Sequence, residues 1–97
     1  MALIWSPGAL DDVQELIRFL DNATGDTTAG NRAASLILEA ADRLVEQPHI
    51  GKATRDDMRE WFAVFGAGAY VLRYRITSAD DILVVRVWHS REDRDLR

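Results

Sequence analysis

The fold is decided by three consecutive stretches, YVLRYRI (residues 70–76), SADD (78–81) and ILVVRVW (82–88). In the first stretch apolar side chains fall on every second position, a period that is typical of β-strands. The third stretch is rich in β-branched residues, which favour strands. The serine and aspartates between them are common turn residues. The sequence therefore predicts an antiparallel β-hairpin.

Side-chain alternation gives this hairpin two faces. If Thr77 lies opposite Ile82, we expect one apolar face that packs on helices: Tyr70 with His89, Leu72 with Val87, Tyr74 with Val85, and Ile76 with Leu83. The other face then carries the arginines: Arg73 opposite Arg86, Arg75 opposite Val84, and Trp88 beside them. Like charges directly across a sheet repel, so this face needs an acid, solvent or a bound partner close to Arg73 and Arg86.

Two interpretations of the arginine face remain open. In the first it is a solvated surface whose arginines pair with Glu60 or with acids of the C-terminal tail. In the second it binds a partner. Tryptophan and arginine are enriched at the hot spots of protein interfaces, so the presence of Trp88 among the arginines favours binding.

A helical hairpin is predicted upstream of the strands. Ser6 is a good N-cap, Pro7 suits the first helical position, and Gly25 ends the first helix. The apolar residues of this helix recur at helical spacing: Leu10, Val13, Leu16, Ile17 and Leu20. A second helix is capped by Asp26, Thr27 or Thr28, and Pro48 prevents it from continuing. Its expected buried stripe is Ala33, Leu36, Ile37, Ala40, Ala41 and Leu44.

Two further strands complete the prediction. A short apolar strand spans residues 2–5, and another spans residues 58–64 before a glycine turn at 66–68. The element order is therefore β-α-α-β-β-β, an N-terminal strand and an antiparallel helical hairpin followed by a three-stranded antiparallel sheet. We expect a two-layer α+β fold in one domain over residues 1–97, with a charged tail at 91–97 that is frayed or forms a short helix.

Composition limits the classes of function. The chain has 97 residues, 47% of them hydrophobic, no cysteine and a net charge of −4. Residues 1–50 hold eight acids and three bases, a balance of −5, whereas residues 51–97 hold eight acids and nine bases, a balance of +1. The acidic total argues against direct nucleic-acid binding. The chain starts without a signal-peptide pattern and has no long apolar run, so we expect a cytoplasmic protein with no membrane contact.

Few residues suggest chemistry. Two distant histidines and no cysteine make a zinc site improbable, and no phosphate-cradling glycine loop or nucleophile elbow occurs, so we expect no metal and no cofactor. A lone histidine is more often structural than catalytic, and Tyr70 is the expected partner of His89. A catalytic interpretation would use His89 together with Arg86. His49, beside Pro48 in a connector, has no expected role.

Three motifs in this order resemble the RelE/ParE superfamily of bacterial toxin–antitoxin toxins, and its ParE-like branch in particular. The first is Trp5-Ser6-Pro7 leading into a helix, and the second is PHIGK (residues 48–52) followed by Met58-Arg59-Glu60. The third and most specific is the pair of strands that ends in RVWHSRED (residues 86–93), which is similar to the family's RVxHxRxD ending. The resemblance spans nearly the whole chain and agrees with the predicted element order.

The resemblance implies a toxin that a small antitoxin neutralises by wrapping a C-terminal segment across it. ParE-like members inhibit DNA gyrase, whereas RelE-like members cut mRNA in the ribosome. The chain departs from the RNA-cutting pattern, because its connector offers only Lys52 and Val71 stands where ribonuclease members often carry a catalytic arginine. His89 is shared by both branches and does not separate them.

We therefore expect a toxin that acts by binding protein, with DNA gyrase as the expected target, in a hetero-oligomer with its antitoxin. The expected contacts for antitoxin or target are Arg59, Arg73, Arg75, Arg86 and Trp88. Two alternatives remain open. One is a ribosome-dependent mRNA endoribonuclease that uses Arg86 and His89, and the other is a non-toxic interaction module derived from a toxin.

Overall fold

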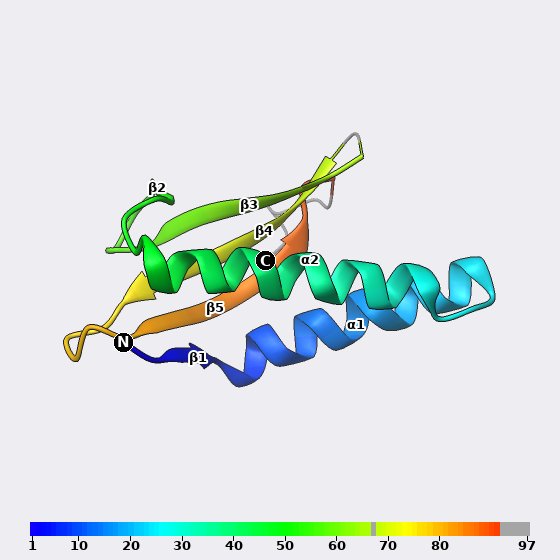
Figure 1. Cartoon of the computed structure of the whole chain (residues 1–97), viewed down its shortest axis with the longest axis horizontal. Coiled ribbons are helices and arrows are strands. Elements are labelled where there is room, and N and C mark those ends of the chain that lie inside the picture. Colours follow the sequence, from blue (N-terminus) through cyan, green and yellow to red (C-terminus); the bar gives the residue numbers. More distant parts are fainter. Residues whose placement is uncertain (67, 92–97) are drawn as a thin grey trace.

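The computed structural model describes residues 1–66 and 68–91. Its element order is β1 (Leu3–Trp5), α1 (Pro7–Thr24), α2 (Thr28–Glu46), β2 (Lys52–Ala53), β3 (Arg59–Phe65), β4 (Gly68–Ile76) and β5 (Ile82–His89). A mixed sheet in the order β1-β5-β4-β3-β2 forms one layer, and the antiparallel pair α1 and α2 crosses one of its faces (Figure 1). The predicted two-layer α+β fold is confirmed.

The sheet is wider than the predicted three strands. β1 joins it in parallel beside β5, with Leu3 opposite Ile82 and Trp5 opposite Val84. The two-residue strand β2 pairs with the start of β3, Lys52 opposite Glu60. The helical hairpin extends beyond the sheet, and the loop between α1 and α2 lies past the end of the sheet at the right of Figure 1.

Local signals fix the helix ends as predicted. The side chain of Ser6 accepts a hydrogen bond from the Ala9 amide at 3.0 Å, and Pro7 is the first helical residue. Gly25 ends α1 in the left-handed conformation with φ 79°, which glycine adopts without a steric penalty. Before α2, the Asp26 carboxylate accepts from the Thr28 amide at 2.8 Å, whereas Thr27 makes no side-chain cap.

The core lies between the helical hairpin and the sheet. α2 supplies most of its predicted stripe, and its buried members are Ala33, Ile37, Ala40, Ala41 and Leu44. The sheet supplies Tyr70, Leu72 and Tyr74 from β4 and Ile82, Val84 and Val87 from β5. Small side chains let the helices approach closely, and a Cβ added at Gly30 would meet the Asp21 carboxylate and Ile17 of α1.

A β-bulge corrects half of the predicted hairpin register. The pairs Tyr70 with His89, Leu72 with Val87 and Arg73 with Arg86 are confirmed. Beyond Arg73 the register shifts by one, so Tyr74 lies opposite Val84, Arg75 opposite Leu83 and Ile76 opposite Ile82. The extra residue is Val85, and such an insertion reverses which residues face the core. Ile82 and Val84 are therefore buried, and the expectation that Leu83 and Val85 pack on the helices is wrong.

Candidate functional site

The face of the sheet opposite the helices carries two rows of side chains, one charged and one apolar. The charged row runs across three strands as Glu60, Arg73 and Arg86. The apolar row beside it consists of Phe62, Val71 and Trp88. We call this surface the outer face. The outer face includes Arg73 and Arg86 of the predicted arginine face, and the acidic residue Glu60 lies at one end of the charged row.

Arg73 is held on the outer face by two neighbours. Its Nε and Nη2 atoms donate to Oε2 of Glu60 at 3.3 and 2.9 Å, and the guanidinium lies 4.9 Å from the ring centroid of Trp88. The Glu60 carboxylate is almost fully buried, so this ion pair is shielded from solvent on the acidic side. The interpretation that an arginine of this face pairs with Glu60 is confirmed.

Arg86 turns away from the outer face and reaches the first helix. Its Nε and Nη2 atoms donate to the two oxygens of Asp12 at 2.8 and 3.1 Å, and the backbone amide of Val87 donates to the same carboxylate at 2.9 Å. Hydrogen bonding to Asp12 raises the pKa of Arg86, which keeps its charge. Because Arg73 and Arg86 have separate carboxylates, their cross-strand repulsion is relieved within the fold.

The other residues that were predicted to contact a partner differ in their exposure and in their own contacts. Arg75 is exposed, as expected for a binding residue. Arg59 is half-buried and donates to the carbonyl oxygens of His49 and Gly51 at 3.2 and 2.9 Å, so it ties the connector to β3. Trp88 is only 1% exposed, and the expectation that it is presented on the surface is wrong. Its ring lies under Arg73 and its strand position is opposite Val71.

A shallow hollow of about 760 Å³ lies on the outer face beside the turn that precedes β3. Basic, acidic and apolar groups share its lining: Lys52, Arg55, Asp56, Glu60, Phe62, Val71, Arg73 and Trp88. Two of its basic side chains, Lys52 and Arg55, are exposed. The hollow can therefore take a polar or anionic group next to an apolar one.

His89 lies on the other face of the sheet. Its ring meets Tyr70 edge-on with centroids 5.4 Å apart, and its Nδ1 accepts from the Arg91 amide at 3.1 Å. Burial raises the pKa of Tyr70 above its ordinary value of 10.0, so the phenol stays protonated at neutral pH. Residues three apart on a strand point to opposite faces, so Arg86 and His89 do not share a face. Arg86 pairs with Asp12 and His89 packs on Tyr70, so the two candidate catalytic residues have separate partners.

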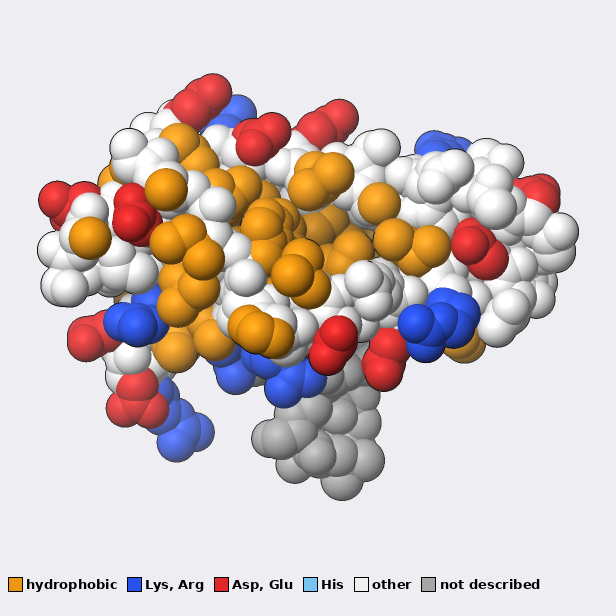
Figure 2. All heavy atoms as spheres, turned by 90° about the horizontal axis from the view of Figure 1, so that it is seen from below, with side chains coloured by type: hydrophobic (Ala, Val, Ile, Leu, Met, Phe, Trp, Pro, Cys, Tyr) orange, Lys and Arg blue, Asp and Glu red, His pale blue; other side chains and the backbone are white. Residues whose placement is uncertain are grey.

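A second hollow, of about 510 Å³, separates α1 from the end of the sheet. His89 and Tyr70 line it together with Leu16, Phe19, Leu20, Phe65 and Val87, and Asp12, Glu15 and Arg91 stand at its polar edge. Figure 2 views the molecule from the side of β1 and α1, and apolar side chains gather over the centre of the surface in this view. Exposed apolar residues of these elements and of α2 include Ile4, Leu10, Phe19 and Leu38.

Two acids that organise the site were not predicted as functional. Asp12 follows buried Ala9 by three positions, so it falls on the buried stripe of α1. An acid at such a position needs partners, and this signal could have identified it. Glu60 was anticipated as a partner for the arginines, yet nothing in the sequence indicated how deeply it is buried.

Within residues 1–66 and 68–91, no group of three or more histidine, aspartate or glutamate side chains could hold a metal ion. None of the helices in this part is long and apolar enough to cross a membrane. The expected frayed or helical tail at 91–97 lies, apart from Arg91, outside the described residues.

Comparisons with known proteins agree with this geometry. A family model described as the ParE toxin of the type II toxin–antitoxin system parDE matches residues 3–94. Toxin RelE3 of Caulobacter vibrioides is 38% identical over 88 residues, covering 91% of this chain and 92% of the relative. Toxin ParE1 of Mycobacterium tuberculosis is 43% identical over 56 residues, covering 58% of this chain and 56% of the relative.

Solved structures show the same fold. A structure titled chromosomal ParDE TA system from P. aeruginosa matches 90% of this chain and 92% of that chain, with a TM-score of 0.73 and 18% identity. The intact E. coli RelBE toxin–antitoxin complex matches with a TM-score of 0.57 and 18% identity, covering 96% of this chain and 98% of that chain. At this identity the structural likeness speaks for the fold alone.

Proposed function

The chain belongs to the ParE family of type II toxin–antitoxin toxins, and we propose that it acts by binding a protein target, DNA gyrase, and not by cutting RNA. We further propose that a cognate antitoxin neutralises it, since the structural neighbours come from toxin–antitoxin systems. Membership of the family is supported over nearly the whole chain, whereas the proposal for the target is based on the chemistry of the outer face.

The observation that carries the proposal is the pairing of the outer-face arginines. Cutting RNA requires a group to activate the 2′-hydroxyl, a group to stabilise the phosphate charge and a group to protonate the leaving oxygen. Arg73 is held by Glu60, and Arg86 by Asp12. Val71 occupies the middle of this face, and His89 lies on the opposite one. This arrangement favours a structural role for the arginines.

Protein binding is supported by exposed apolar surface next to charge. Phe62 lines the hollow and is 41% exposed, and Val64, two positions further along β3, is 74% exposed. Large exposed apolar groups with a polar surround mark interaction sites. Arg75, together with the exposed part of Arg73, is the proposed contact for antitoxin carboxylates, because the guanidinium fork suits them. Arg59, Arg86 and Trp88 then shape this face from beneath.

A ribosome-dependent mRNA endoribonuclease is the second candidate. It is favoured by the hollow that holds Lys52, Arg55, Glu60 and Arg73, where a phosphate could meet cations near a carboxylate. Two relatives in Caulobacter vibrioides also carry the name RelE. In this candidate Lys52 and Arg55 bind the phosphate, because they are exposed and Arg73 is already paired.

The test is pulse-labelling of DNA and protein synthesis after the chain is induced in bacteria without antitoxin, followed by a supercoiling assay with purified gyrase. We expect DNA synthesis to fall first and supercoiling to be inhibited. The double variant Lys52→Ala, Arg55→Ala should retain toxicity. An early loss of translation that this double variant abolishes would refute the proposal and establish the ribonuclease. If neither synthesis falls, the chain is a non-toxic interaction module.

A further inference from the structure

The side of the helical hairpin that faces away from the sheet carries two exposed leucines. Leu10 of α1 is 49% exposed and Leu38 of α2 is 53% exposed, and neither belongs to the core. Single exposed leucines are common on protein surfaces, whereas neighbouring ones form a patch that is typical of interaction sites. Their relative position therefore decides what this side of the molecule can bind.

The packing of the helices brings the two leucines together. A Cβ at Gly30 of α2 would touch Ile17 and Asp21 of α1, so the antiparallel helices are level at these residues. Leu10 lies two turns before Ile17, and Leu38 lies two turns after Gly30, so each leucine is on the side of its helix that borders the other helix. Both helices advance by about 1.5 Å per residue, so Leu10 and Leu38 lie at the same level of the hairpin.

The two leucines are part of a larger apolar patch. Ala34 and Val45 are half-buried, and they lie four positions before and seven positions after Leu38, on the same side of α2. Apolar side chains gather over the centre of the surface in Figure 2, with acidic side chains along its upper border. We call the surface around Leu10, Ala34, Leu38 and Val45 the helical face.

Acidic residues surround the helical face. Asp11 follows Leu10 in the sequence, Asp42 lies one helical turn after Leu38, and both carboxylates are exposed. Further exposed acids occur on the same parts of the two helices: Glu15, Glu39 and Glu46. A partner of the helical face therefore meets an apolar centre with a negative rim.

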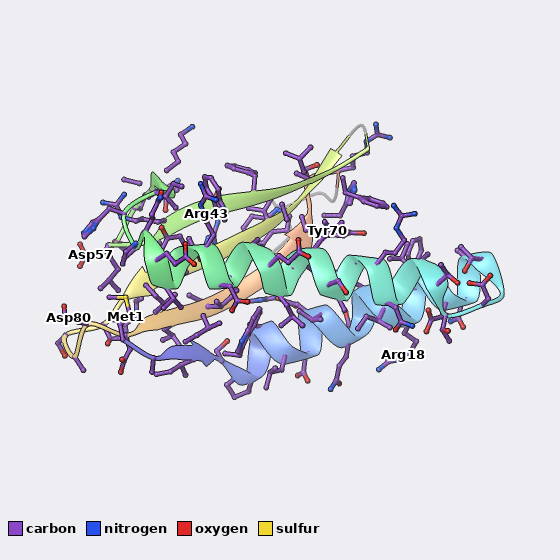
Figure 3. The ribbon with its side chains drawn as sticks, in the orientation of Figure 1. Met1, Arg18, Arg43, Asp57, Tyr70 and Asp80 are labelled. Carbon is purple, nitrogen blue, oxygen red and sulfur yellow. The ribbon has the colours of Figure 1, made fainter. Side chains whose placement is uncertain are left out.

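The exposed arginines of the two helices lie elsewhere. Arg18 is eight positions beyond Leu10, about 12 Å along α1 toward the loop. Arg32 lies 5.7 Å from the ring centroid of Phe65, and Figure 3 shows Arg43 on the same side of α2, the side that faces β3. The negative rim is therefore not neutralised by the arginines of α1 and α2.

This charge defines the partner. A second copy of the chain would bring one negative rim against another, and like charges repel. The antitoxin carboxylates that we propose for Arg75 would be repelled in the same way. A protein that handles DNA must instead expose positive surface, because affinity for phosphates depends on lysine and arginine. Such a surface complements the helical face.

We propose that the helical face docks on a cationic, partly apolar surface of the target protein, with Leu10 and Leu38 in the dry centre and Asp11 and Asp42 at the rim. The inference rests on the proposed function, inhibition of DNA gyrase, and assigns the target to the side of the molecule opposite the outer face. Buried apolar groups at the centre supply affinity, and the charged rim supplies attraction and orientation.

Two double variants test the proposal in the supercoiling assay with purified gyrase. Leu10→Gln with Leu38→Gln replaces the apolar centre by polar side chains of good helix propensity, and Asp11→Asn with Asp42→Asn removes two charges from the rim. We expect each to raise the concentration needed for half-inhibition by about tenfold or more. Inhibition by the parent chain should weaken as salt is added, and less so for the asparagine variant, because salt screens exposed charges.

The matched control is Asp57→Asn with Asp80→Asn. It makes the same charge change at two exposed turn residues, which Figure 3 labels away from α1. Asparagine tolerates their left-handed backbone, with φ 62° and 63°. Half-inhibition by this control should change by less than about threefold. Antitoxin affinity, measured by titration calorimetry, should change by less than about threefold in all three double variants, which also shows that they are folded.

The other outcomes overturn the inference in different ways. If the parent chain inhibits gyrase and both helical-face variants inhibit equally well, the docking face is wrong while the proposed function stands. A loss of antitoxin affinity in these variants would assign the helical face to the antitoxin. A parent chain that sediments as a dimer, and becomes monomeric with Leu10→Gln and Leu38→Gln, would assign it to a second copy. If the parent chain does not inhibit gyrase, the proposed function fails and this inference fails with it.

Discussion

The carboxylate of Asp12 holds the guanidinium of Arg86 across 74 residues of sequence, through hydrogen bonds of 2.8 and 3.1 Å. The same carboxylate accepts from the Val87 amide, so one side chain of α1 satisfies three donors of β5. The two ends of the ion pair differ in environment, since the Asp12 side chain is 10% exposed and that of Arg86 is 43% exposed. This contact fixes α1 to the edge of the sheet.

Asp12→Ala should lower the free energy of unfolding by about 2–4 kcal/mol, because the buried Val87 amide and the Arg86 guanidinium lose their common acceptor. Arg86→Ala should cost less, about 1–2 kcal/mol, since solvent can replace part of the more exposed partner. Urea unfolding followed by circular dichroism measures both values. Asp11→Ala, at the exposed neighbouring position, is the control and should change stability by less than about 0.5 kcal/mol. If Asp11→Ala and Asp12→Ala lower the free energy of unfolding equally, the proposed role of Asp12 in holding α1 on the sheet is wrong.

Much of the fold could be predicted because its signals are local. The Ser6 cap, the Gly25 stop and the alternation in β4 each involve residues within a few positions of one another. The bulge at Val85 could not be predicted. It depends on how β5 meets both β4 and β1, and no local pattern of four apolar residues indicates which of them is the extra one.

The site was harder to predict than the fold, for a physical reason. Alternation correctly assigned Arg73, Arg86 and Trp88 to one side of the hairpin, but it contains no information on what covers them. Arg86 turns to an acid of α1, and Trp88 is covered by an arginine of its neighbouring strand. Both contacts depend on side-chain length and on the angle between layers, which a sequence period does not give.

Tyr74→Phe should destabilise the fold by about 1–3 kcal/mol. The Tyr74 hydroxyl donates to the Pro48 carbonyl at 2.7 Å and accepts from the Gly51 amide at 3.0 Å, so it fastens the connector after α2 to the core. Removing the oxygen leaves both backbone groups without this partner. Thermal unfolding measures the loss, and hydrogen exchange at the Gly51 amide should increase. A variant as stable as the parent, with unchanged exchange at Gly51, would contradict this role.

The chain should lose stability in alkali. Burial raises the pKa of both Tyr70 and Tyr74 above 10.0, so the unfolded state releases their protons first. Stability from these phenols is therefore complete below about pH 10 and falls as the pH rises through that value. The thermal midpoint should drop between about pH 9 and pH 11, and less steeply in the double variant Tyr70→Phe, Tyr74→Phe. A pH slope that does not change in the double variant would assign the loss to other groups.

Arg75→Glu should separate binding from folding on the outer face. Arg75 is exposed, so the substitution should change the free energy of unfolding by less than about 0.5 kcal/mol. We expect it to lower antitoxin affinity by about tenfold or more, since it replaces a carboxylate-binding fork with a repelling charge. Arg73→Glu should instead destabilise the fold by about 1–3 kcal/mol, because it sets a second carboxylate against Glu60.

The control for Arg75 is Arg18→Glu, the same charge change at an exposed arginine of α1 that Figure 3 labels away from β4. Titration calorimetry with the antitoxin measures affinity for both variants. If Arg18→Glu weakens binding as much as Arg75→Glu, the loss of affinity results from the change in net charge. The outer face would then not be the antitoxin-binding surface. A selective effect at Arg75 would tie the antitoxin to the face where β3, β4 and β5 carry their paired charges.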